Sequence, residues 1–156
     1  MKCVVLTKYE ERICEWVGRQ RFEHARKNNL EAGQGTSKGN RNADNHIRGA
    51  RGELAASIML NVCWRPNIGQ TKEPDIGRNI EVKTTDRPDG RLIVKPDDHA
   101  KDDAPYVLVF FRDVHFELVG WEYAGEAKKW PILDYGKDPC HYVDQGALRP
   151  ISELKT

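Results

Sequence analysis

The sequence predicts an α/β domain in which helices flank a mixed central β-sheet. Three observations indicate this class: two long N-terminal segments with helical spacing of apolar residues, short segments with a period of two after residue 75, and a continuous apolar run at 106–111. With 156 residues the chain has the length of one domain. We expect a single domain, 1–156, made of an N-terminal helix and basic loop (1–43), a core (44–111) and a C-terminal hairpin, short helix and tail (112–156).

The first 43 residues predict a helix followed by a loop. Residues 9–28 place four apolar side chains among charges at near-helical spacing: Ile13, Trp16, Val17 and Phe22. Residues 31–42 are rich in Gly, Asn and other polar residues and predict a loop. Lys38 and Arg41 would either lie along a phosphate backbone or belong to a solvated linker.

Residues 44–61 predict a second helix, with Asp44 as its N-cap. Four apolar residues are expected to face the core: Ile47, Leu54, Ile58 and Met59. Gly49 and Gly52 lie inside this helix, where glycine costs about 1 kcal/mol relative to alanine. Their presence predicts close approach to another element or a ligand.

The following segments predict strands. Residues 75–76, a turn at 77–79 and residues 80–85 are typical of a hairpin. The period of two places Glu81 and Lys83 on one polar face, opposite Ile80 and Val82.

After a turn at 88–90, further elements are expected in this order: a strand at 92–94, a helix or charged loop at 96–103, strands at 106–111 and 114–119, and a short helix at 122–129. Three apolar residues should dock the tail: Leu148, Ile151 and Leu154.

Charge divides unevenly along the chain, although the net charge is only +1. Residues 1–72 hold 13 basic and 7 acidic residues, a balance of +6, and the remainder has a balance of −5. This asymmetry suits a protein whose first half meets an anion while its second half holds cations. Two differently solvated faces would produce the same pattern.

Several classes of function are not indicated by the sequence. No apolar stretch approaches the roughly 20 residues that span a bilayer, and the first residues lack a signal-peptide pattern. The four cysteines form no CxxC pair and the five histidines are dispersed, which disfavours a zinc site. We therefore expect a soluble, cytoplasmic protein with reduced thiols, no membrane partner and no organic cofactor.

One arrangement of residues indicates a catalytic site: Asp75, Glu81 and Lys83. The carboxylates are hard oxygen ligands, and the backbone carbonyl of Val82 would add a third, which suits Mg²⁺ or Mn²⁺. Such an ion makes bound water easier to deprotonate and offsets charge growing on a phosphate. Lys83 would orient that water, stabilise the phosphorane, or act as base. These three roles remain open.

Pro74-Asp75, five further residues and Glu81-Val82-Lys83 resemble the signature of the PD-(D/E)XK nuclease superfamily. The resemblance covers roughly residues 44–111 and implies a restriction-endonuclease-like core of helix, three strands, helix and strand. It also implies that Glu53, on the first core helix, is a further catalytic or metal-binding acid. Arg48 and Arg51 would then lie near phosphates.

The implied activity is hydrolysis of phosphodiester bonds in DNA by an endonuclease that serves DNA processing, recombination or repair. The small size looks more like Holliday-junction resolvases and other phage or archaeal nucleases than like restriction enzymes; a phage-encoded protein would act in the host cytoplasm. Many members of the superfamily form homodimers. Lys95, Asn79 and Thr85 are secondary candidates for phosphate contact, with an ordinary structural role as the alternative.

Three other hypotheses remain. A protein of the same fold would bind nucleic acid without cutting it, or the acidic half would dock a basic protein partner. The third concerns four clustered acidic residues: Asp97, Asp98, Asp102 and Asp103. They are either a calcium-binding loop or a solvated charged turn, and the absence of an EF-hand ligand pattern favours the turn.

Overall fold

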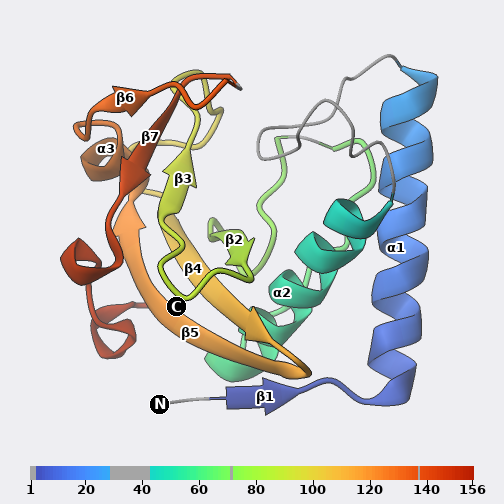
Figure 1. Ribbon diagram of the computed structural model, residues 1–156. Coiled ribbons are helices and arrows are strands. Elements are labelled where there is room, and N and C mark those ends of the chain that lie inside the picture. Colours follow the sequence, from blue (N-terminus) through green and yellow to red (C-terminus); the bar gives the residue numbers. More distant parts are fainter. Residues whose placement is uncertain (1–2, 29–42, 71, 137) are drawn as a thin grey trace.

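The chain is arranged in successive layers of helices and sheets, as Figure 1 shows. The computed structural model describes residues 3–28, 43–70, 72–136 and 138–156. Within them, one of two long helices covers one face of a four-stranded sheet, the other packs on the outer side of that helix, and a three-stranded sheet with a short helix packs on the other face. The predicted α/β class with a mixed sheet is confirmed.

Helix α1 (Lys8–Lys27) begins at a capping box that the sequence analysis did not identify. The Glu10 N–H donates to Thr7 Oγ1, and the Thr7 N–H donates to the Glu10 carboxylate at 2.6 Å, which satisfies two backbone donors at the helix start. The face of α1 toward the core is narrow: Cys14, Val17 and Gly18. Trp16 and Ile13 are more than half exposed, so apolar character at helical spacing identified only Val17 of this buried face.

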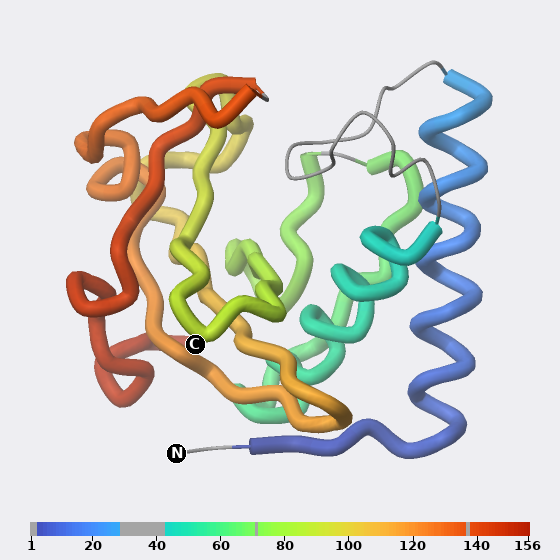
Figure 2. The backbone as a smooth tube through the Cα atoms, in the orientation of Figure 1, coloured from blue at the N-terminus to red at the C-terminus, as the bar shows by residue number. Residues whose placement is uncertain are grey.

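Helix α2 (Asp44–Leu60) lies between α1 and the sheet, as the trace in Figure 2 shows. The helices approach closely where Gly18 meets Ile47, since a Cβ at Gly18 would lie 2.5 Å from that residue. Two predictions about α2 were wrong. Ala43 occupies the N-cap position and Asp44 is the first helical residue, where its carboxylate still meets the positive end of the helix dipole. Ile58 is 41% exposed, because it lies on the outer side of the helix.

The central sheet has the strand order β1-β5-β4-β2. Its strands are β1 (Cys3–Val5), β5 (His115–Tyr123), β4 (Pro105–Arg112) and β2 (Glu81–Thr85). Strand β2 runs parallel to β4, and the remaining pairs are antiparallel, so the sheet is mixed. The apolar run occupies β4, an interior strand whose first five residues are buried, as expected for a strand covered on both faces.

The second sheet was not predicted. Strand β3 (Leu92–Val94) pairs with β7 (Cys140–Val143), which also pairs with β6 (Ile132–Leu133), so β3 does not join the central sheet. Residues 96–103 form turns, and the helical alternative is wrong. This segment therefore supplies no helix before β4, where the resemblance placed one. The predicted helix at 122–129 shortens to α3 (Ala124–Ala127), because β5 continues through Tyr123.

Alternation along β4 divides the core into two clusters. Val107 and Val109 face α1 and α2, whereas Tyr106 and Leu108 face β3, β7 and α3. The tail docks as predicted. Leu148 packs on the second cluster and both Ile151 and Leu154 on the first, near two 3₁₀ turns (Gln145–Ala147 and Ile151–Glu153). No helix within the described ranges is long and apolar enough to cross a membrane, and all four cysteines are free thiols.

Candidate active site at the edge of strand β2

Asp75 lies beside the open edge of β2. The predicted hairpin is reduced to one antiparallel bridge, in which Ile76 and Ile80 exchange two backbone hydrogen bonds of 3.2 Å. Gly77 adopts a φ of +58° in the turn, a conformation that favours glycine. The Val82 N–H donates to Asp75 Oδ2 at 2.8 Å. The turn and this bond fix the Asp75 carboxylate against the strand that carries Glu81.

Glu81 and Lys83 project from the face of β2 turned away from α2, as their alternation with Val82 requires. Glu81 is 7% exposed. Burial, followed by the charge of Asp75, raises the pKa of Glu81 to about 8, and a side-chain hydrogen bond that the protonated Glu81 donates to the Asp75 carboxylate acts in the same direction. The Lys83 Nζ lies 5.4 Å from the centre of the Tyr106 ring. The structure therefore brings Asp75, Glu81 and Lys83 together.

Glu53 reaches the same strand from the helical side. Its helix packs so tightly on β2 that a Cβ at Gly52 would lie 1.8 Å from Thr84 Oγ1, which confirms the predicted close approach at Gly52. Nothing lies within 4 Å of the equivalent atom at Gly49, so no other element of the described chain approaches this glycine. Burial and then Asp75 raise the pKa of Glu53. Asp75 thus lies within electrostatic reach of both glutamates.

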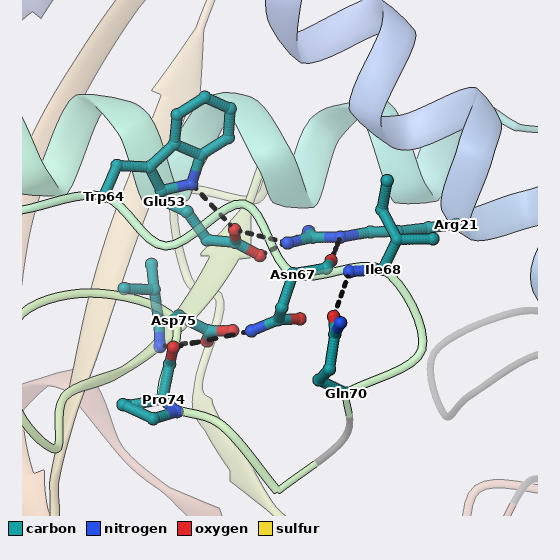
Figure 3. A network of polar contacts seen from close by, with 9 residues as sticks. Arg21, Glu53, Trp64, Asn67, Ile68, Gln70, Pro74 and Asp75 are labelled. Carbon is teal, nitrogen blue, oxygen red and sulfur yellow. Dashed lines mark hydrogen bonds and ion pairs between the residues drawn. The ribbon is translucent and has the colours of Figure 1, made fainter.

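The Glu53 carboxylate is held by two side chains that the sequence analysis did not identify (Figure 3). Arg21 Nη1 and Nη2 donate to its two oxygens at 2.6 and 2.9 Å, and Trp64 Nε1 donates at 3.0 Å. Arg21 lies 32 positions from Glu53 in the sequence, on another helix, so no local pattern links the two. The only sequence signal was an arginine on the helix expected to precede the core.

His99 and Asp98 were also missed as neighbours of the site. His99 Nε2 lies 3.7 Å from Glu81 Oε1, and His99 Nδ1 lies 3.5 Å from Asp98 Oδ1. The Asp98 carboxylate accepts a 3.0 Å hydrogen bond from the Ala100 N–H. Burial alone would raise the pKa of Asp98, but the nearby Tyr106 hydroxyl, this N–H and Lys83 outweigh it and lower the pKa.

The predicted phosphate-binding residues are dispersed. Arg48 pairs with Asp86 at 2.9 Å and Arg51 pairs with Glu11, so both approach acidic side chains. Lys95 follows β3 and, with Lys83, acts electrostatically on the Cys140 thiol.

The remaining candidate residues either take no part in the contacts around Asp75 and Glu81 or lie outside the described part of the chain. Asn79 is exposed in the turn, and Thr85 Oγ1 accepts a hydrogen bond from the Arg87 N–H at 3.2 Å. Lys38 and Arg41 lie outside the described residues. Neither Asn79 nor Thr85 joins the contacts around Asp75 and Glu81 described above.

Asp75 and Glu81 have the donor chemistry that Mg²⁺ or Mn²⁺ requires. Among the described residues, no group of three or more His, Cys, Asp or Glu side chains is arranged to hold a metal ion. Magnesium, however, commonly takes one or two carboxylates and keeps several waters. Two adjacent acids, one with a pKa raised by burial and by the other, form a pair whose repulsion a cation would relieve. The residues present therefore fit the ion.

Comparisons of the chain with protein-family models, with curated proteins and with solved structures found no match in any of the three.

Proposed function

We propose that this protein is a metal-dependent endonuclease that hydrolyses phosphodiester bonds in DNA. One observation carries the proposal: the Asp75 carboxylate is bonded to the backbone of β2 beside the buried Glu81, and Lys83 lies on the same face as Glu81. The carboxylates of Asp75 and Glu81 supply two oxygen ligands, and Lys83, two residues after Glu81, supplies a positive charge. These are the three functional groups required for metal-assisted phosphodiester hydrolysis.

In this proposal, Asp75 and Glu81 hold Mg²⁺ or Mn²⁺, with the Val82 carbonyl as a further ligand. The ion, when bound, supplies Lewis-acid chemistry that lowers the pKa of water and offsets charge on phosphate. The Val82 N–H holds the Asp75 carboxylate in place, so little reorganisation is needed at this residue. Burial of Glu81 excludes bulk water from its carboxylate and strengthens its electrostatic interactions.

Lys83 supplies the positive charge of the site. It is partly buried and rests over the Tyr106 ring, which restricts where its ammonium group can move. From this position it donates hydrogen bonds to a phosphate oxygen or orients the attacking water. Arg48 and Arg51 contribute to DNA binding by exchanging carboxylate partners for phosphates, since partly exposed ion pairs contribute at most about 1 kcal/mol.

A plasmid-nicking assay tests the proposal. Wild type, Glu81→Gln and the control Asp103→Asn are incubated with supercoiled DNA in Mg²⁺, Mn²⁺ and EDTA. Asp103 is an exposed acid in the 97–103 loop, which makes it a matched removal of one carboxylate charge. Nicking by wild type and Asp103→Asn in the two metals, but not in EDTA or by Glu81→Gln, supports the proposal. DNA binding without cutting by wild type would identify a non-catalytic binding protein instead.

A further inference from the structure

We propose that Arg21, anchored by Glu53, is a positioning residue that sets the location of Asp75. The first part of this inference concerns structure alone, and only its effect on metal binding rests on the proposed function. It assigns to α1 a part in the site, although α1 lies outside the core that the sequence analysis identified. It also gives Glu53 a role that does not require direct contact with a metal ion.

Arg21 links both long helices to the loop that precedes Asp75. Its Nη1 and Nη2 bind the Glu53 carboxylate, and its Nε donates to the Asn67 carbonyl at 2.8 Å. The side chains of Arg21 and Glu53 are only 14% and 8% exposed. The planar guanidinium presents these donors in a fixed geometry, so the position of Glu53 determines where Asn67 can lie.

The segment 63–67 is in turn the support for the segment that contains Asp75. The Arg65 N–H donates to the Asp75 carbonyl at 3.0 Å, and the Gly77 N–H donates to the Cys63 carbonyl at 2.8 Å. Asn67 Nδ2 also lies 3.5 Å from the Pro74 carbonyl, a contact visible in Figure 3. Because of these backbone hydrogen bonds, a displacement of segment 63–67 would also displace Asp75.

Trp64 provides a second connection between Glu53 and this segment. Its indole N–H donates to the Glu53 carboxylate, and its backbone forms an antiparallel bridge with Ile76, the residue after Asp75. Glu53 thus holds the supporting segment at both ends, through Trp64 directly and through Arg21 at Asn67. Displacement of either contact should move the Asp75 carboxylate relative to the Val82 N–H.

Charge supports the same assignment. Both oxygens of Glu53 already accept hydrogen bonds, which gives this carboxylate a complete set of protein partners. Arg21 offsets the repulsion between Glu53 and Asp75, because it lies within electrostatic reach of both acids. Replacement of Arg21 would leave two nearby carboxylates without the charge that holds them together.

The test compares Arg21→Lys with Arg19→Lys. Arg19 lies on the same helix and pairs with Glu15 at 2.7 Å, but this pair is exposed and contacts no part of the site, so it controls for loss of a guanidinium fork. Hydrogen exchange of the Val82 amide reports the bond to Asp75 directly, with or without metal. Titration with Mn²⁺ then reports the effect on the proposed ligands.

Arg21→Lys should accelerate exchange at Val82 by at least about tenfold, and weaken Mn²⁺ binding by roughly 10- to 100-fold. Arg19→Lys should leave both unchanged. Unchanged Val82 exchange in a folded Arg21→Lys protein would overturn the positioning role. If wild type binds no Mn²⁺ while the Val82 effect is present, the positioning role stands and the proposed nuclease function fails.

Trp64→Phe keeps the inference testable if Arg21→Lys does not fold. This variant retains an aromatic ring and the backbone bridge to Ile76 but removes the N–H that donates to Glu53. Val82 exchange should rise by a smaller factor than in Arg21→Lys. A folded Trp64→Phe protein with the exchange rate and Mn²⁺ affinity of wild type would contradict the assignment of Glu53 as the anchor.

Discussion

Two acid-rich regions of this chain differ in what surrounds their carboxylates. The loop at 97–103 holds four aspartates, of which three are exposed; the fourth, Asp98, is largely buried and lies next to the site through His99. Asp75 and Glu81 are fewer, yet they lie together at a strand edge, and Glu81 is buried. The pKa of Glu81 is raised, whereas that of Asp98 is lowered.

The comparison shows that the density of acids in the sequence is a poor guide to a cation site. Solvated carboxylates repel one another weakly, because water screens their charges. A buried carboxylate next to a second one carries an electrostatic cost that ligand binding can remove. The proposed site is therefore the sparser of the two regions, and substitutions at Lys83, Asp75 and Glu81 test that distinction.

Lys83→Ala should have the largest effect. Removal of the only lysine of the proposed constellation should lower the nicking rate by roughly 10²- to 10⁴-fold, while DNA affinity falls only modestly, since many basic residues share the phosphate contacts. Lys101→Ala, in the aspartate-rich loop, is the control and should cut normally. Single-turnover rates and gel-shift affinities measure the two quantities. Normal cutting by Lys83→Ala would remove this residue from the mechanism.

Replacement of magnesium by calcium should abolish most cleavage and preserve binding. Calcium has a larger and less regular coordination shell, so it orients an attacking water poorly. Binding and nicking are measured on the same DNA with each ion. Brisk cutting with calcium alone would count against the assignment of the ion to Asp75 and Glu81.

Asp75→Asn should separate stability from function. The substitution removes repulsion with both glutamates and retains an oxygen that accepts from the Val82 N–H, so without metal the variant should melt at an equal or higher temperature. Wild type should gain about 2.7 kcal/mol at a hundredfold excess of Mg²⁺ over its dissociation constant, and the variant much less. Asp97→Asn should respond to Mg²⁺ like wild type. Equal stabilisation of all three proteins would assign Asp75 a purely structural role.

The stability of the metal-free protein should depend on pH through Glu81. The pKa of this residue rises from an ordinary 4.5 to about 8 on folding, so its contribution is fully present below 4.5 and is lost as the pH rises through 8. The lowered pKa of Asp98 gives the opposite sign, with stability lost only as the pH falls below the ordinary value of 3.8. Urea unfolding in EDTA at pH 5.5, 7 and 8.5 should show a decline that Glu81→Gln reduces. A decline of the same size in Glu81→Gln would assign it to other groups.

The smallest effects concern the packing of α2 on β2. Gly52→Ala should destabilise the protein by about 1–3 kcal/mol, because the new methyl group meets Thr84. Gly49→Ala, one turn earlier, meets no neighbour and should stabilise the helix by up to about 1 kcal/mol. Chemical denaturation of both variants gives the two values. Equal changes in the free energy of unfolding would show that α2 does not approach Thr84 of β2 closely at Gly52.

The elements that depend on local pattern were predictable. Helical spacing located α1 and α2 to within a residue or two, and the period of two placed Glu81 and Lys83 on one face, away from Val82. The apolar run at 106–111 predicted an interior strand because a strand covered on both faces needs no polar alternation. The buried face of α1 was harder to predict from the sequence, since Trp16 and Ile13 are exposed while Cys14 and Gly18 are buried.

The sequence by itself determined the α/β class, the two long helices, and the proximity of Asp75, Glu81 and Lys83, because each depends on residues within a few positions of one another. Only the tertiary structure decided that β3 pairs with β7, that residues 96–103 form turns, and that Arg21 and Trp64 hold Glu53. These contacts join residues distant along the chain. Periodicity tells which face of an element is apolar, but the element against which that face packs is selected by the free energy of the whole fold.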